Sequence, residues 1–405
     1  MNPSTKDNKA PASFDPSFGT QGIVRIQLAS ESFYGTSRLL PDGKILSVGS
    51  ILSSDMLVIV RHTTDGVLDD TFGNQGVVHT RLPENHNATL LNFVVQSNGK
   101  IIVFLGLGDG FNPFGVALFA RLLPDGRLDL IFGTNGMTSF NIQLDAGRRR
   151  TGIAVQPDGK VFVAAETADI GAGRGGVIFG LSANGQPDVT FGNNGLVYGM
   201  EGATFQSLTL QGDKILVGGI YQKGGLIARY TDKGELDLSY GGYNHGFVLI
   251  DGTGGVHVEL IHLSQQPDGK TLAAGYIFKG GMGGVLTGAL PLLSRVNLDG
   301  KEDNTFNGGK ALEIFVNGEL DYGWHALYAT VQADEKIVVL CQPPGSTRSA
   351  LLRYIKDGTP DADFGTQELQ IISSQPSPVV QVQPDNKILI SGSTDGTGII
   401  ARLLG

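Results

Sequence analysis

Short apolar runs recur along the chain, and each is bounded by a turn rich in Gly, Asp and Asn. Residues 152–165 show the pattern: Gly-Ile-Ala-Val is followed by Gln-Pro-Asp-Gly-Lys and then by Val-Phe-Val-Ala-Ala. Two β-rich runs joined by a tight polar turn predict a β-hairpin. The chain as a whole therefore predicts many short strands joined by turns.

The hairpin turn occurs seven times, with the ideal form Gln-Pro-Asp-Gly-Lys. The fourth copy departs from it, because it reads Gln-Gly-Asp-Lys. The closing lysines are Lys44, Lys100, Lys160, Lys214, Lys270, Lys336 and Lys387.

A second motif alternates with the turn and reads Asp, two residues, an aromatic residue and usually Gly. Its aromatic residues lie 49 to 66 residues apart. The fifth copy has a tyrosine, and the sixth has Asn307 in the place of Gly. The seven aromatic residues are Phe18, Phe72, Phe132, Phe191, Tyr240, Phe306 and Phe364.

Each repeat predicts four strands: one enters the turn, one returns from it, a third leads to the aromatic corner and a fourth follows it. Four antiparallel strands in a repeat of about 40–60 residues are typical of a β-propeller blade. The chain ends after a third strand, and the missing corner and fourth strand occur at residues 14–28. We therefore expect an all-β, seven-bladed β-propeller whose last blade is closed by the N-terminal strand, which leaves no open edge. Residues 1–13 are expected to form a flexible tail, and residues 14–405 a single domain.

The pairing of the turn with a corner such as Asp-Gly-Val-Leu-Asp-Asp-Thr-Phe-Gly-Asn-Gln-Gly at residues 65–76 resembles the bacterial delta-60 repeat family. The resemblance covers residues 14–405 and implies a β-propeller. It implies no activity and no site residue, because the family offers none that can be transferred to named positions.

The repeated polar residues have an architectural and a functional interpretation, and their use in nearly every blade favours the first. The corner Asp can accept N–H groups across its turn while the aromatic residue plugs the space between blades, or the aspartates can form a ring of calcium sites. A third-strand Arg can pair with a corner Asp between blades or bind a ligand, and Gly180 replaces it in the third blade. A Gln before the turn can satisfy buried backbone groups. These arginines are Arg61, Arg121, Arg229, Arg295, Arg353 and Arg402, and the glutamines are Gln96, Gln156, Gln266, Gln332 and Gln383.

Composition and charge exclude several classes of protein. Gly accounts for 60 of 405 residues and charged residues for 17%, so long amphipathic helices are not expected. The net charge of −9 and a single basic run at residues 148–150 disfavour nucleic-acid binding. Cys341 is the only cysteine, which excludes an internal disulfide and a cysteine-built zinc site.

The chain also lacks two targeting signals. No run of about 18 apolar residues predicts a membrane span. The first residues contain no apolar core of a cleavable signal peptide. We therefore expect a cytoplasmic protein or one exported without a leader.

The two ends of the predicted ring differ. The turns and corners lie at one end and are uniform, whereas the second-to-third and fourth-to-inner connections lie at the other end and vary. Function on a scaffold usually resides in irregular loops, so we expect a site on this variable face and at the channel mouth. Aromatic, amide and charged side chains there suit a carbohydrate or a peptide. The candidate ligand-binding residues are Tyr34, Asp109, Phe111, Phe114, Arg148, Arg149, Asp169, Arg174, Asp321, Tyr322, Trp324 and His325.

Two groups of these candidates have a second interpretation. Tyr322 and Trp324 precede an inner strand and can instead plug the space between two blades. Arg148 to Arg150 can hold an anion or an acidic partner, or lie in a solvated loop.

No catalytic motif is found. Residues 171–176 match Gly-x-Gly-x-x-Gly, but no helix follows, so they do not predict a dinucleotide site. His257, Glu259 and His262 do not share one strand face, which disfavours a metal site. We expect no cofactor and no metal. Carboxylates from different blades can still meet at the channel mouth, and this pool is Glu31, Glu84, Asp109, Asp145, Asp169 and Asp321.

The sequence thus favours a monomeric, non-enzymatic binding scaffold that presents variable loops to a protein or a glycan. The alternative is a carbohydrate-active hydrolase or lyase, in which two of these acidic residues act as acid and base.

Overall fold

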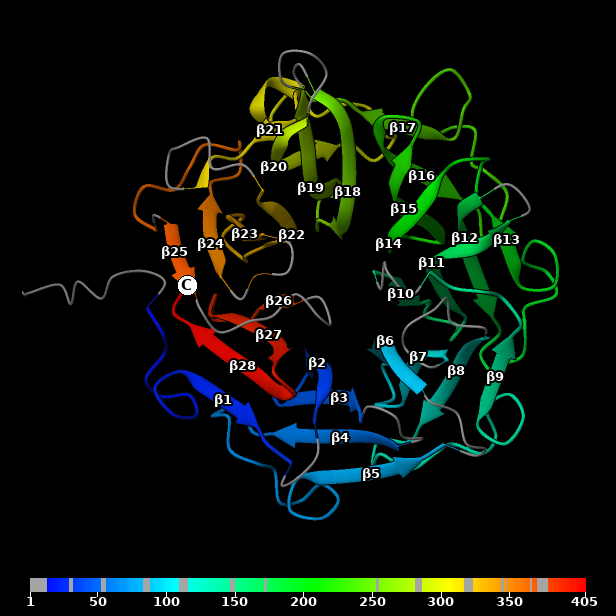
Figure 1. The fold of residues 1–405 in the computed structure, drawn as a ribbon, viewed down its shortest axis with the longest axis vertical. Helices are drawn as coiled ribbons and strands as arrows, with labels where there is room; N and C mark the ends of the chain where they lie inside the picture. Colours follow the sequence, from blue (N-terminus) through cyan, green and yellow to red (C-terminus); the bar gives the residue numbers. More distant parts are fainter. Residues whose placement is uncertain are drawn as a thin grey trace, which may run out of the picture.

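Seven four-stranded antiparallel sheets surround a common centre in the computed structural model (Figure 1). Each sheet is one blade, so the protein is a seven-bladed β-propeller, as the sequence predicts. The structure describes residues 13–28, 32–51, 56–82, 88–108, 116–145, 150–170, 173–252, 255–280, 286–316, 323–343, 346, 348–364, 366–369 and 378–405.

The strands of each blade follow one another from the centre outward. Blade 1 consists of β2 (Tyr34–Leu39), β3 (Ile45–Ser50), β4 (Met56–His62) and β5 (Val77–Arg81). Blade 2 consists of β6 (Ala88–Val95), β7 (Ile101–Leu107), β8 (Val116–Leu122) and β9 (Met137–Phe140). Blade 3 consists of β10 (Gly152–Val155), β11 (Val161–Ile170), β12 (Gly173–Leu181) and β13 (Leu196–Tyr198).

The later blades repeat this order. Blade 4 consists of β14 (Thr204–Gln211), β15 (Lys214–Tyr221), β16 (Gly224–Tyr230) and β17 (Phe247–Ile250). Blade 5 consists of β18 (Gly255–Gln265), β19 (Thr271–Gly280), β20 (Leu286–Val296) and β21 (Leu312–Glu313), with a short 3₁₀ turn η1 (Asn307–Gly309) before β21. Blade 6 consists of β22 (His325–Val331), β23 (Ile337–Gln342), β24 (Ser349–Tyr354) and β25 (Thr366–Leu369).

Blade 7 is built from both ends of the chain. It consists of β26 (Val379–Val382), β27 (Ile388–Thr394), β28 (Thr397–Leu403) and the N-terminal β1 (Ile23–Ile26) as its outermost strand. β1 pairs with β28 in antiparallel register, from Ile23 opposite Ala401 to Ile26 opposite Gly398. The predicted closure by the N-terminal strand is confirmed, and β28 has no open edge along this register.

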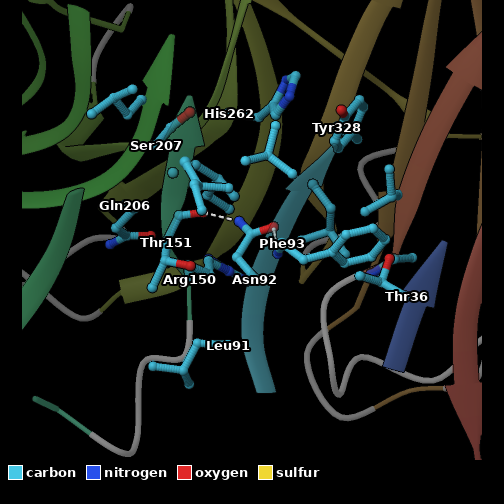
Figure 2. A pocket seen from close by; sticks show the side chains of 18 of the residues that line it. Thr36, Leu91, Asn92, Phe93, Arg150, Thr151, Gln206, Ser207, His262 and Tyr328 are labelled. Carbon is cyan, nitrogen blue, oxygen red and sulfur yellow. Dashed lines mark hydrogen bonds between the residues drawn. The ribbon is translucent and has the colours of Figure 1, made fainter. Parts of the chain in front are cut away.

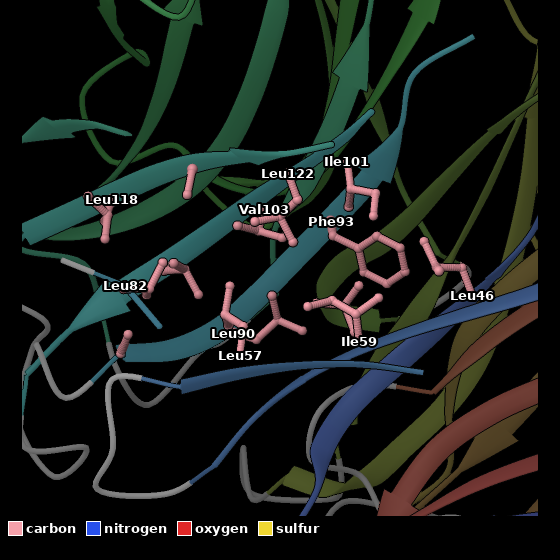
Figure 3. Close-up of a cluster of buried hydrophobic side chains, with 14 of the residues drawn as sticks. Leu46, Leu57, Ile59, Leu82, Leu90, Phe93, Ile101, Val103, Leu118 and Leu122 are labelled. Carbon is pink, nitrogen blue, oxygen red and sulfur yellow. The ribbon is translucent and has the colours of Figure 1, made fainter. Parts of the chain in front are cut away.

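The hydrophobic core lies between blades rather than in one central mass. One buried group joins side chains of blade 1, such as Leu46 and Ile59, to side chains of blade 2, such as Phe93 and Val103 (Figure 3). Both faces of a blade are covered in this way, which explains why the second and third strands are apolar at nearly every position.

A buried ion cluster anchors the uniform end of each blade. In blade 2, Asp129 Oδ2 accepts Lys100 Nζ of the turn at 2.9 Å and Arg121 Nε of the third strand at 2.7 Å. Arg121 Nη1 also donates to the Ala183 carbonyl of blade 3 at 2.7 Å. The Arg–Asp pair recurs in all blades but the third, with partners Asp69, Asp129, Asp237, Asp303, Asp361 and Asp15.

This geometry corrects one expectation. The Arg–Asp pair lies within a blade and not between blades. In blades 1, 2, 4, 5 and 6 the Asp follows its Arg by eight residues, and in blade 7 Arg402 of β28 pairs with Asp15, which precedes β1 of the same blade. The contact with the next blade is made by the Arg-to-carbonyl hydrogen bond instead. The corner Asp also accepts the backbone N–H two residues later, as Asp69 does from Thr71 at 3.2 Å, so its oxygens serve the architecture.

The aromatic residue of each corner is a plug between blades, as predicted. Phe132 is fully buried, and its ring lies against Gly185 of blade 3, where a Cβ atom would come within 2.5 Å of it. The guanidinium of Arg121 also lies over this ring, with its Cζ 4.7 Å from the ring centre. In blade 3, where Gly180 replaces the Arg, the Phe191 ring lies 2.5 Å from the position of an added Cβ.

The glutamines before the turns also act as expected where their bonds are described. Gln156 Nε2 donates to the Asp213 carbonyl at 3.0 Å, and Gln332 Nε2 donates to the Asn386 carbonyl at 2.8 Å, each in the next blade. Within the described ranges, no helix is long and apolar enough to cross a membrane.

Candidate functional site

The inner strands of all seven blades line one cavity of about 170 Å³ in the central channel. One residue from each blade faces it at the same level, and Figure 2 shows several of these side chains around a common space. They lie eight residues before the turn lysine, or seven in blade 4, where the turn is one residue shorter. This channel ring consists of Thr36, Asn92, Gly152, Ser207, His262, Tyr328 and Val379.

Beta-bulges shape the wall next to the channel ring. The register between the inner and second strands shifts by one residue at Leu91, Gln206, Ile261 and Leu327, which are the extra residues in blades 2, 4, 5 and 6. A bulge re-aims the side chains beside it and occurs often near functional sites. Each bulge adds its residue to the cavity lining.

Gly152 of the channel ring is required by close packing. A Cβ atom there would lie 1.9 Å from the backbone nitrogen of Leu208 in blade 4. We expect Gly152→Ala to lower the free energy of unfolding by about 1–3 kcal/mol, because the two inner strands must separate. Chemical denaturation would measure the loss, with Gly224→Ala in β16 as a control, where the nearest atom lies at 3.1 Å. Equal stability of the two variants would contradict this packing.

The channel lining is cationic, although the protein carries a net charge of −9. It contains Arg38 and Arg150, and no Asp or Glu is among its described residues. Arg38 is half-buried. Its Nη2 donates to Asn92 Oδ1 at 2.8 Å and its Nη1 to the Ser37 carbonyl at 3.0 Å. Asn92 Nδ2 in turn donates to the Thr151 carbonyl at 2.7 Å, so blades 1, 2 and 3 together fix the guanidinium.

Two aromatic rings, from blades 5 and 6, also line the cavity. His262 stacks on Tyr328 with ring centres 3.6 Å apart. Burial, and then the positive charge of Arg38, lower the pKa of His262 to about 3, so its imidazole is neutral at pH 7. Burial raises the pKa of Tyr328, while Arg38 opposes the rise. The pair therefore offers an uncharged aromatic surface.

A buried polar network borders the cavity at Gln206. Gln206 Nε2 donates to Glu166 Oε1 at 3.2 Å and to Glu259 Oε1 at 2.5 Å, so these two oxygens lie within about 6 Å of each other. The Tyr276 hydroxyl donates to the other oxygen of Glu259, and the Tyr276 ring stacks on His325 at 3.6 Å. Burial, and then Arg150, lower the pKa of His325 to about 4, against the opposing effect of Glu259.

Three of the predicted site residues are described in full. Trp324 is only 1% exposed and packs between blades 5 and 6, so it takes the plug role that the sequence left open. His325 is buried beside Tyr276, and Tyr34 is half-buried at the start of β2. None of the three lines the channel cavity. The others lie outside the described residues: Asp109, Phe111, Phe114, Arg148, Arg149, Asp321, Tyr322, and the side chains of Asp169 and Arg174.

The pool of candidate carboxylates is described only at Asp145. This residue is buried, and its backbone N–H donates to the Glu166 carbonyl at 3.1 Å. Glu31, Glu84, Asp109, Asp321 and the side chain of Asp169 lie outside the described residues. The close carboxylate pair is formed instead by Glu166 and Glu259, which the sequence did not single out as a pair. In the part of the chain that the structure describes, no group of three His, Cys, Asp or Glu could hold a metal ion.

Comparisons with known proteins agree with this fold. A family model described as a β-propeller domain of unknown function, DUF5122, matches residues 40–72 and 156–191. Both segments run from a hairpin turn to an aromatic corner, and together with the seven blades of the structure they support a propeller repeat protein. A search of curated proteins finds no match.

Solved structures show the fold alone, because the sequence identities are low. An ulvan lyase of polysaccharide lyase family PL25 is 12% identical and has a TM-score of 0.51, over 94% of this chain and 96% of that chain. A GH74 xyloglucanase from Xanthomonas campestris is 12% identical with a TM-score of 0.50, over 92% of this chain and 54% of that chain. A prolyl oligopeptidase B from Galerina marginata is 11% identical with a TM-score of 0.50, over 92% and 49%.

Proposed function

We propose that the protein is a non-enzymatic binding propeller that presents its variable face and channel mouth to a glycan. The observation that supports the proposal is the channel ring: each blade supplies one residue to a shared cavity, and no two blades supply the same residue type. Amide, hydroxyl and guanidinium groups beside a stacked aromatic pair match the mixed polar and apolar surface of a sugar. A protein partner on the same face is the other ligand that the sequence allows.

The cavity size supports binding of a chain end. At about 170 Å³, it is smaller than the roughly 300–1,000 Å³ of pockets that enclose a whole drug-sized ligand. We therefore infer that one terminal sugar enters the channel, while the rest of the glycan lies across the variable face.

A glycan array with three purified proteins tests this proposal. Val379→Phe fills the channel ring without removing a polar group, and we expect it to abolish binding that the unaltered protein shows. Val189→Phe is the matched control, because Val189 is 75% exposed on the uniform end. Melting temperatures establish that both variants fold. Binding by a folded Val379→Phe protein would contradict a site in the channel, and silence of all three proteins would shift the search to a protein partner by pull-down.

The second candidate function is a carbohydrate-active hydrolase or lyase. The closeness of Glu166 and Glu259 favours it, because retaining glycosidases hold two carboxyl groups about 5–5.5 Å apart. Each of the two is only 2% exposed, and both are bonded to Gln206, which favours a structural role. Shortened products after incubation with an array-positive glycan would establish the enzyme.

Two finer assignments accompany the proposal. We propose that the seven repeats are delta-60 repeats, which the recurrence of the turn and the corner in all seven blades supports. We also propose that the protein is a monomer, since the described strands form a closed ring and each blade already covers its neighbours.

A further inference from the structure

We infer that the glycan recognised in the channel is acidic and that its anionic group binds the guanidinium of Arg38. This inference rests on the proposed function and adds the chemical class of the ligand. Arg38 belongs to no motif of the repeat, because none of the other six blades has an Arg at the corresponding position.

No carboxylate is among the described hydrogen-bond partners of Arg38. Arg38 is half-buried inside the ring, and its described partners are two neutral oxygens, the Ser37 carbonyl and Asn92 Oδ1. The arginines of the uniform end differ in this respect, because each of them has an Asp within 3.0 Å. A cation removed from water is normally paired with an anion. An incoming carboxylate or sulfate ester would complete the pair.

The guanidinium of Arg38 is also preorganised. Arg38 is held at Asn92, its Cζ lies 5.0 Å from the centre of the Phe93 ring, and Asn92 is held by blade 3 through the Thr151 carbonyl. A guanidinium fixed in this way loses little conformational entropy when a ligand binds. Charge-assisted hydrogen bonds to such a group are about twice as strong as neutral ones.

Among the described residues, the two carboxylates bonded to Gln206 at the edge of the cavity are already engaged. Glu259 accepts Gln206 Nε2 and the Tyr276 hydroxyl, and Glu166 accepts the same Gln206 nitrogen. Besides Arg38, the titratable groups among the described lining residues are Arg150, His262 and Tyr328, and none of these three is an anion at pH 7. The cavity therefore attracts negative charge, and Arg38 is the group that fixes its place.

The cavity also offers an aromatic surface to the rest of the sugar. The stacked pair of His262 and Tyr328 lies at the same level as Thr36 and Asn92 in the channel ring. A pyranose ring can place an apolar face on these aromatic rings while its substituent points to Arg38. One acidic sugar would thereby use both sides of the cavity.

The experiment compares matched pairs of ligands. Uronic-acid oligosaccharides are tested beside the same oligosaccharides after reduction of the carboxyl groups to alcohols, and sulfated neutral oligosaccharides beside their desulfated forms. We expect the acidic member of one pair to bind and its neutral counterpart to bind at least about tenfold more weakly, since a hydrogen bond to a charged group is worth about 1.5–3 kcal/mol. The pair that shows the difference identifies the anionic group as a carboxylate or a sulfate.

Two variants place the effect at Arg38. Arg38→Gln is expected to weaken binding of the acidic ligand by about 10- to 100-fold and to leave binding of its neutral counterpart unchanged. Arg127→Gln is the control, since the Arg127 side chain is 75% exposed on the uniform end. Melting temperatures check that both variants fold, and the ligand pairs alone decide the charge preference if Arg38→Gln does not fold.

The outcomes separate this inference from the proposed function. Equal binding of acidic and neutral glycans, or an Arg38→Gln protein that retains full affinity for the acidic one, would overturn the inference and leave a glycan-binding propeller. Failure of every glycan to bind would overturn the proposed function itself.

Discussion

Removal of residues 1–28 is expected to make the protein aggregate or to lower its melting temperature by on the order of 10 °C. The deletion takes away β1 and so exposes β28 along the register from Gly398 to Ala401. It also removes Phe18, which is fully buried, and Asp15, which accepts Arg402 Nε at 2.9 Å and Lys387 Nζ at 3.3 Å. Loss of a buried Phe alone costs about 3–5 kcal/mol.

A shorter deletion is the control for this experiment. Removal of residues 1–12 leaves Asp15, Phe18 and β1 in place, so we expect a melting temperature close to that of the full chain. Calorimetry and size-exclusion chromatography of both proteins measure the two effects. A protein without residues 1–28 that melted and eluted like the control would contradict the role of β1 in closing the ring.

Acid is expected to destabilise the protein in two stages. The first involves His62, His262 and His325, whose pKa values burial lowers to about 4, 3 and 4. The unfolded chain binds protons at these residues below about pH 6.5, whereas the folded protein does not. Stability is therefore expected to decline as the pH falls from about 6.5 to 4, by up to about 1.4 kcal/mol per pH unit for each group.

The second stage involves the seven corner aspartates. Burial opposes ionisation of Asp15, but hydrogen bonds from Ser17, with Arg402 and Lys387, outweigh it and lower its pKa to about 2. The pKa of every other corner aspartate is lowered as well: Asp69, Asp129, Asp188, Asp237, Asp303 and Asp361. A lowered pKa in the folded state stabilises the protein above about pH 4 and no longer does so once the pH falls through the folded value. The loss should therefore steepen below pH 4.

Urea denaturation from pH 8 to pH 3 measures both stages. Asp361→Asn should lower stability at pH 7, because Lys336 and Arg353 lose their shared carboxylate, and it should make the slope below pH 4 shallower. Asp158→Asn is the control, as Asp158 is an exposed carboxylate of a turn. A free energy of unfolding that stays constant down to pH 3 would contradict the roles given to both sets of groups.

The architecture could be predicted because the turn and corner residues that determine it recur in every blade. The turn lysines and the corner aromatics specify where each hairpin and each corner lies, and their count gives the number of blades. The split of the last blade followed from a corner at Phe18 with no strand before it and a strand at Arg402 with no corner after it. Hydrogen bonds to the neighbouring blade are harder to predict: the repeat pattern is compatible with an Arg–Asp pair between blades, whereas the pair lies within one blade.

The candidate site could not be found in this way, because its residues do not repeat. Thr36, Asn92, His262 and Tyr328 share a level only when positions are counted back from the turn lysine. The channel ring could therefore be found from the sequence by this count. The bulge at Gln206 could not be predicted, since strand alternation alone gives no sign of the extra residue. Glu166 and Glu259 lie 93 positions apart in the chain, and their meeting at one amide nitrogen depends on how blades 3, 4 and 5 are inclined toward one another.

The residues that stabilise the propeller are not the residues of the channel ring, which would contact a ligand. The turn lysine, the corner Asp and the aromatic plug act at the opposite end of each blade and leave the channel-ring position free of the ion cluster. Seven positions on separate blades can therefore be exchanged one at a time, within the limit that close packing sets at Gly152. The same scaffold can acquire a new ligand preference through a few substitutions, and its stability is largely independent of which ligand that is.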